Sequence, residues 1–269
     1  MAYKTDLTDK QWRIIKQVLT QPSKRGRRYG EGTRQVVNAL LYVAHTGCQW
    51  RYLPDAFGPW TRIWSQFRRW SENDTLGVLL TELHKAARET RGREHGLPSL
   101  VVVDTHLSRG ASNGGVTFHN QGGPRGCTKG AKRVVAVDVT GLPLYALVVP
   151  AGTSESVCVE KLASRLVAFG QNKRLDVLLA DKGISAKAAE RLTKEHGFEV
   201  RRYGWTTQPV DPMTGRKVFK PLKHSWKVEA AHAQLGKSRR LAKSFENTEQ
   251  SATAWLNLAC IAMVLNDLK

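Results

Sequence analysis

Three acidic residues stand where carboxylates could hold divalent metal ions. Asp104 and Asp181 each directly follow a run of aliphatic residues, and Glu229 is the one acid within the strongly basic segment 216–243. Mg²⁺ takes hard oxygen ligands and keeps several waters, so two or three carboxylates and a substrate phosphate suffice to bind it. Two such ions can activate an attacking hydroxyl and stabilise the leaving oxygen in phosphoryl transfer. The three acids are therefore candidate metal ligands for chemistry on a nucleic-acid phosphate.

Each of the two aspartates also has a structural interpretation. Asp104 could start a turn after its strand, and Asp181 could cap the helix that follows it. Ser185 is the better N-cap for that helix, which leaves Asp181 without this role. Asp138 is expected to be structural, because it begins a hairpin turn, and Asp176 is set aside because it precedes its strand and faces the wrong end of the sheet.

Glu229 is expected on an amphipathic helix. Val228, Ala231 and Leu235 recur three and four residues apart and predict one buried face. A neighbouring face carries Glu229 and His232 together with small residues, which leaves room for a DNA backbone. From the residues alone the alternative stays open that Glu229 only neutralises nearby lysines, a pairing worth at most about 1 kcal/mol when exposed.

The charge balance predicts a polyanionic partner. The net charge is +19 over 269 residues; residues 1–95 hold 17 Lys and Arg against 9 Asp and Glu, and residues 96–269 hold 25 against 14. An excess spread over both parts argues against a single basic tail, and nucleic acid is the commonest partner of such a chain. The residues expected to contact double-stranded DNA are Arg62, Arg68, Arg69, Lys129, Lys132, Arg133, Lys227, His232, Lys237, Arg239, Arg240 and Lys243.

Other sequence features narrow the class of protein. The four cysteines lie far apart and predict neither a disulfide framework nor a zinc site. No signal peptide is expected from the N-terminal residues. The apolar segment 252–265 is interrupted by Asn257 and is too short to span a bilayer. A protein of the reducing cytoplasm without a membrane partner is expected.

Residues 1–95 are predicted to form a small all-α domain. Thr8 and Gln11 have the spacing of a capping box at the start of the first helix. Further helices are expected to begin near Thr33, Trp60 and Asp74. The pattern is typical of a helix-turn-helix DNA-binding module, and the alternative is a bundle for dimerisation or support. The apolar face of the third helix would consist of Trp60, Ile63, Trp64 and Phe67.

A change of pattern near residue 95 predicts a second domain, residues 96–269. The polar segment 91–98, which contains Gly and Pro, marks the boundary. Three strands in succession, followed by alternating helices and strands, match a ribonuclease-H-like mixed α/β sheet better than a uniformly parallel fold. Residues 106–130 and 203–224 are expected to be long loops that order on DNA. The expected strands are 100–103, 133–138, 144–149, 177–180 and 198–202, with helices at 156–169 and 185–196.

The chain resembles the DDE transposases of bacterial insertion sequences, in the superfamily typified by insertion sequences four and five. The spacing of 77 residues from Asp104 to Asp181, and of 48 from there to Glu229, makes the combination specific. The resemblance extends over nearly the whole length and depends on the blocks Trp50–Pro54, Phe57–Trp60, Val102–Asp104, Leu179–Gly183 and Val228–Leu241.

This resemblance implies a function for the three acids. They would be the metal-binding triad of a ribonuclease-H-like core that uses Mg²⁺, with Mn²⁺ as a substitute. The protein would bind the terminal inverted repeats of an insertion sequence as a homodimer or higher oligomer. It would cleave the DNA strands with water and then join the freed 3′-hydroxyl ends to target DNA.

Two positions depart from the family pattern. Many relatives carry Arg directly after the Glu and an aromatic residue after the second Asp-x-Gly, where this chain has Ala230 and Ile184. His232 or Arg240 are candidates to replace the missing Arg. Two other functions stay open, namely a structure-selective nuclease on the same fold and a catalytically inactive DNA-binding regulator.

Overall fold

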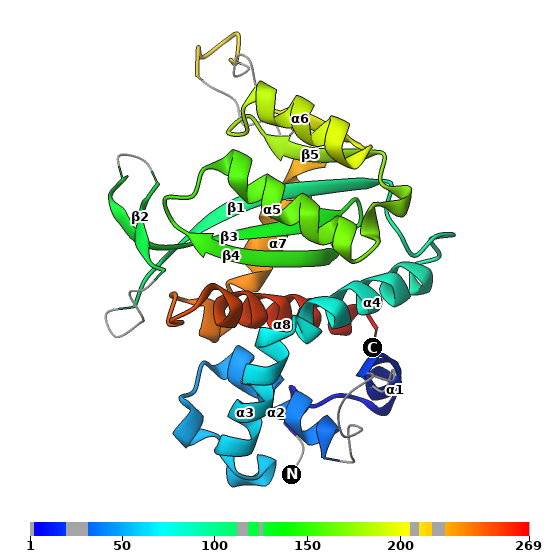
Figure 1. The fold of residues 1–269 in the computed structure, drawn as a ribbon, viewed down its shortest axis with the longest axis vertical. Coiled ribbons are helices and arrows are strands. Elements are labelled where there is room, and N and C mark those ends of the chain that lie inside the picture. The colour runs from blue at the N-terminus through cyan, green and yellow to red at the C-terminus, as the bar shows by residue number, and fades with distance from the viewer. Residues whose placement is uncertain are drawn as a thin grey trace.

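A mixed β-sheet with helices on both faces forms the centre of the protein (Figure 1). The computed structural model describes residues 3–19, 32–111, 118–123, 126–204, 210–216 and 224–268. Four helices precede the sheet: α1 (Asp9–Leu19), α2 (Thr33–Thr46), α3 (Trp60–Glu72) and α4 (Thr75–Thr90). Two short 3₁₀ turns, Trp50–Tyr52 and Asp55–Phe57, join α2 to α3.

The start of α1 has the predicted capping box. The Thr8 N–H donates to Gln11 Oε1 at 2.9 Å, and the Gln11 N–H donates to Thr8 Oγ1 at 3.2 Å. Two donors that the helix itself leaves without a partner are thereby satisfied. Gln11 Nε2 also donates to the carbonyl of Leu265 at 2.7 Å, which ties the first helix to the last.

The predicted apolar face of α3 is wrong at Trp64. Its side chain is 37% exposed, and the Arg68 guanidinium lies 5.2 Å from its ring centre. The buried stripe consists instead of Ile63, Phe67 and Trp70, which are four and three residues apart. A helix of this length needs one such stripe toward the core, and Trp64 falls outside it.

The sheet has the topology that the order of elements predicted. Strand β3 (Thr128–Asp138) runs antiparallel to both β1 (Leu100–Arg109) and β4 (Pro143–Pro150). Strands β5 (Val177–Asp181) and β6 (Glu199–Tyr203) run parallel to β1, which gives the order β4-β3-β1-β5-β6. A short strand β2 (Asn120–Gly122) pairs with the start of β3. The ribonuclease-H-like mixed sheet is therefore confirmed.

Two hydrophobic cores lie on opposite faces of the sheet. Helices α5 (Glu155–Ala168) and α6 (Ala186–His196) pack on one face, with Val101 and Val103 of β1. Helices α7 (Ser225–Leu235) and α8 (Glu249–Asp267) pack on the other face, with Val102 of β1 and Leu179 of β5. The alternation along β1 follows from the two-residue period of a strand. Short 3₁₀ turns at Gln171–Arg174 and Arg239–Leu241 complete the regular structure of the described residues.

Helix α8 closes the β4 edge of the sheet. The backbone N–H groups of Ala146 and Val148 donate to Asn257 Oδ1 and Thr253 Oγ1, both at 3.0 Å. The fully buried Asn257 that interrupts an apolar segment thus satisfies a strand edge that would otherwise lack partners. The helices α1–α4 share one continuous core with α8 (Figure 1). The domain boundary near residue 95 stays a prediction.

One of the two predicted loops is wrong in large part. Residues 106–109, 120–122 and 128–130 of segment 106–130 are strand, because the polar end of β1 is held by pairing with β3. Residues 112–117 and 124–125 of this segment lie outside the described residues. For segment 203–224 the structure describes only residues 203–204, 210–216 and 224.

Asp138 has the structural role predicted for it: its carboxylate accepts from Arg88 and from Thr140 of the turn. Within the described ranges, no helix is long and apolar enough to cross a membrane.

Candidate active site

Asp104 and Asp181 occupy neighbouring positions on two parallel strands. β1 and β5 pair with Val103 opposite Ala180, and each aspartate is the next residue on its strand. Because side chains alternate, both aspartates lie on the sheet face of Val102 and Leu179, which α7 and α8 cover. Asp104 does not end its strand, contrary to the prediction: β5 ends here, while β1 continues to Arg109 beside β3.

Asp181 is not needed as a helix cap, as the sequence indicated. Ser185 is the N-cap of α6, and its Oγ accepts from the Ala188 N–H at 3.1 Å. The exposed Asp181 carboxylate accepts only from the N–H of the next residue, Lys182, at 2.6 Å among the described contacts. Gly183 lies against Glu155, where an added Cβ would stand 2.7 Å from Glu155 Cγ. The backbone after Asp181 therefore runs close to the start of α5.

Helix α7 brings Glu229 to the same face. Its buried residues Val228, Ala231 and Leu235 pack into the core beneath the sheet, as predicted, and Glu229 is exposed. His232 follows one turn later, and its Nε2 lies 3.9 Å from Asp104 Oδ2. Since residues three apart share a helix face, Glu229 and His232 both project toward the edge where β5 ends.

The carboxylates influence one another electrostatically. Burial raises the pKa of Asp104 to about 6, and the charges of Asp181, Glu155 and Glu229 raise it as well, against a hydrogen bond from the Thr105 backbone. Four carboxylates therefore share this edge of the sheet, and a cation placed among them would relieve their repulsion.

Tyr203 of β6 is affected by the same carboxylates. It stands opposite Asp181 in the strand register. Burial raises the pKa of its hydroxyl, and the charges of Asp104, Asp181 and Glu229 add to the effect. The three acids that the sequence singled out thus act on one neighbouring group.

The chemical types of the donors fit a divalent metal, although the donor side chains stand apart from one another. Among the residues that the structure describes, no three His, Cys, Asp or Glu side chains stand close enough together to hold an ion. The available donors are carboxylate oxygens, the ligands that Mg²⁺ and Mn²⁺ prefer. Burial chiefly raises the pKa of Asp104, and the neighbouring carboxylates add to the effect, so a bound cation would favour its charged form.

Sequence reasoning missed three neighbours of the site. Glu155 at the start of α5 and Tyr203 at the end of β6 arrive through the tertiary fold, and no local pattern marks them. His106 could have been found, because it follows Asp104 by two residues on one strand and so shares its face. Its ring centre lies 5.4 Å from that of His232.

Most of the predicted DNA contacts lie at the surface. Arg62, Arg68 and Arg69 are exposed on α3, although Arg68 pairs with Glu72 and Arg69 donates to Gln66. Lys227 is half-buried on α7, with its Nζ 4.0 Å from the centre of the Trp226 ring. The remaining exposed ones are Lys129, Lys237, Arg239 and Lys243.

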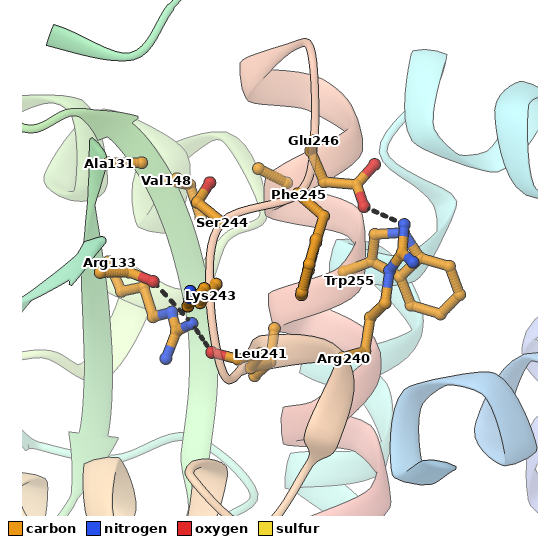
Figure 2. Close-up of a pocket in the computed structure, with 12 residues that line it drawn as sticks. Ala131, Arg133, Val148, Arg240, Leu241, Lys243, Ser244, Phe245, Glu246 and Trp255 are labelled. Carbon is orange, nitrogen blue, oxygen red and sulfur yellow. Dashed lines mark hydrogen bonds and ion pairs between the residues drawn. The ribbon is translucent and has the colours of Figure 1, made fainter. Parts of the chain in front are cut away.

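Arg133 does not lie at the surface and is not a DNA contact in this fold. It is 8% exposed and donates to Ser108 Oγ at 3.0 Å and to the carbonyl of Leu241 (Figure 2). Burial lowers its pKa to about 10. The guanidinium thus joins the sheet to the 3₁₀ turn after α7. The prediction failed because the partner carbonyl is 108 residues away in the sequence.

Arg240 and Lys132 also bind within the chain. Arg240 pairs with Glu246 and lies over the Trp255 ring, 5.1 Å from its centre (Figure 2). Lys132 Nζ donates to Glu155 and to the Thr153 carbonyl, each at 2.7 Å. Both cations thus have acidic partners within the chain, and Lys132 is paired with an acid beside the site. His232 is turned toward Asp104 and is only 9% exposed, so it does not stand in the outer basic surface either.

Comparison with known families decides the relationship. The family described as "Transposase DDE domain" matches residues 95–265, which is more than half of the chain. The chain belongs to the DDE transposase family. The N-terminal part of this transposase, residues 7–80, matches the family described as "Putative transposase of IS4/5 family".

Individual relatives of the transposase are distant. It is 31% identical over 81 residues to the uncharacterized protein y4sN of Sinorhizobium fredii, a match that spans 30% of this chain and 65% of that protein. The Mos1 mariner paired-end complex with Mn is 14% identical, covering 92% of this chain and 78% of the other, with a TM-score of 0.34. A piggyBac transposase synaptic complex with hairpin DNA is 11% identical, covering 97% and 73%, with a TM-score of 0.36. Structural similarities with such low identities and TM-scores give no evidence beyond the family match.

Proposed function

We propose that this transposase cleaves DNA at the ends of an insertion sequence and joins the freed 3′-hydroxyl ends to target DNA. Asp104, Asp181 and Glu229 would hold the divalent ions of the reaction. The observation that carries the proposal is the strand register that sets Asp104 beside Asp181 on the face where α7 presents Glu229. The raised pKa of Asp104 adds that these groups share one electrostatic site.

The three acids would contribute differently to binding the divalent ions. Asp104 is the most buried of the three and stands beside Asp181 on the neighbouring strand, so it would be the most firmly placed ligand, with Asp181 and Glu229 as the further ligands. Mg²⁺ or Mn²⁺ bound there would supply activation of the attacking water or 3′-hydroxyl and stabilisation of the leaving oxygen. The chain itself supplies the rigid placement, because Asp104 is held between two paired strands.

The basic residues after α7 would bind the DNA backbone. Lys237, Arg239 and Lys243 are exposed just beyond the helix that carries Glu229. Phosphate contacts of this kind fix the position of a duplex without reading its sequence. We place the terminal inverted repeats against this segment and against the exposed arginines of α3. A homodimer or higher oligomer would then hold two ends together.

Strand joining of a labelled element end to a plasmid in Mg²⁺ or Mn²⁺ tests the proposal. Asp104→Asn, Asp181→Asn and Glu229→Gln should each abolish cleavage and joining while DNA binding persists, because each removes one ligand charge. Asp176→Asn is the matched control, since this exposed aspartate lies just before β5 at its other end. Full activity of any one of the three variants would remove that residue from the site. Cleavage without joining would instead favour a nuclease.

A further inference from the structure

His232 occupies a place among the acids that their metal chemistry does not explain. Its Nε2 is 3.9 Å from Asp104 Oδ2, and its side chain is 9% exposed. That nitrogen is buried and has no hydrogen-bond partner among the described residues. Burying a polar atom without a partner costs free energy, so the position calls for a ligand.

The surroundings of the ring hold its nitrogen toward the acids. His232 follows Glu229 by three residues on α7, and the buried face of that helix fixes its rotation. His106 packs against the ring with 5.4 Å between centres and an interplanar angle of 32°. His106 belongs to the same strand face as Asp104. The imidazole therefore packs against His106, with its Nε2 near the Asp104 carboxylate.

The distance suits a shared cation better than a direct hydrogen bond. At 3.9 Å the Nε2 to Oδ2 separation is too long for a hydrogen bond. Two ligands side by side on one ion, each about 2.1 Å from it, stand about 3 Å apart. The observed separation exceeds that of two ligands on one ion by about 1 Å. Asp104 is one of the three acids to which the proposed function assigns the metal.

We propose that His232 is a metal ligand of this site, giving it one nitrogen donor and a preference for Mn²⁺ over Mg²⁺. Imidazole favours first-row transition metals, whereas Mg²⁺ selects oxygen ligands. The inference depends on the proposed function, because it takes Asp104 as a ligand of the same ion. It concerns a residue that the three-acid site does not include.

Electron spin-echo spectroscopy of bound Mn²⁺ tests this without reference to activity. Wild-type protein should show modulation from a ¹⁴N nucleus, and growth with ¹⁵N-histidine should replace it with the ¹⁵N pattern. His232→Phe keeps the ring but removes the nitrogen, and should abolish the modulation. The matched variant His106→Phe should retain it. Mn²⁺ bound with no nitrogen modulation would overturn the inference, as would modulation that disappears only in His106→Phe.

Affinity measurements separate this inference from the proposed function. In His232→Phe the Kd for Mn²⁺ should rise roughly tenfold, the scale of losing one partner of a metal site, while that for Mg²⁺ changes far less. An equal loss for both ions would refute the preference. Asp104→Asn should weaken both ions. If it weakens neither, the carboxylate site itself is wrong, whereas Mn²⁺ bound by Asp104 without nitrogen leaves the proposed function intact.

Discussion

The charge of Asp104 should destabilise the metal-free protein at neutral pH. Its pKa is raised from 3.8 to about 6, chiefly by burial, and its side chain is 29% exposed. The folded state thus holds the proton more tightly than the unfolded state, so the free energy of unfolding falls as pH rises from about 4 to 6 and stays low above. A rise of this size corresponds to about 3 kcal/mol at pH 8.

Asp104→Asn removes this penalty and makes it measurable. Linkage between the two pKa values gives a penalty of about 1.6 kcal/mol at pH 5 and about 3 kcal/mol at pH 8. The stability gain of Asp104→Asn over wild type should therefore grow by about 1.4 kcal/mol between these pH values. Urea denaturation in chelator at several pH values gives the comparison, with Asp176→Asn as the exposed control.

Divalent metal should reverse the ranking of the two proteins. Mg²⁺ at about 1,000 times its Kd would stabilise the wild type by about 4.1 kcal/mol, more than the penalty of about 3 kcal/mol at pH 8, and the Asn variant by much less. The reasoning would be refuted by a stability difference that is the same at pH 5 and pH 8. A variant that is less stable than wild type at pH 8 in chelator would refute it as well.

Three further predictions separate the structural role of a residue from a role in DNA binding or cleavage. Arg133→Ala should lower the free energy of unfolding by about 1–3 kcal/mol, since it leaves a buried carbonyl without its donor. Lys243→Ala should change the free energy of unfolding by less than about 0.5 kcal/mol. It should also make the slope of log K for DNA binding against log salt shallower by about 0.9, from a wild-type value near −7 that assumes roughly eight neutralised phosphates. Ser185→Ala should cost about 1 kcal/mol through its lost cap, with cleavage retained below the melting range; loss of cleavage in folded protein would show that Asp181 depends on this cap.

Local signals in the sequence predicted much of the fold. The capping box at Thr8 and the cap at Ser185 lie where expected, because a helix start depends on residues within one turn. Gly47 ends α2 with a φ of 69°, a left-handed conformation that glycine adopts without strain. The order of strands and helices then left few topologies, of which the mixed sheet is one.

Charges inside the protein could not be predicted in the same way. From the sequence, Arg133 cannot be distinguished from the other cations of a basic chain. Its hydrogen bond to the carbonyl of Leu241 shows that it is structural. Arg240 is likewise held by Glu246 and by the Trp255 ring. A net charge of +19 therefore overstates the number of cations available to DNA. Partners distant in sequence decide which cations remain free.

The position of Asp104 inside its strand, and not at its end, affects how the candidate site is built. Both aspartates follow aliphatic runs and are predicted at strand ends, yet only β5 ends there. β1 continues for five more residues, and their pairing with β3 holds Asp104 in a regular strand. The open edge needed by a ligand exists because β5 is short. Asp104 is therefore held by strand pairing, whereas Asp181 and Glu229 are exposed. The register of two parallel strands, and not a shared strand end, is what sets Asp104 beside Asp181.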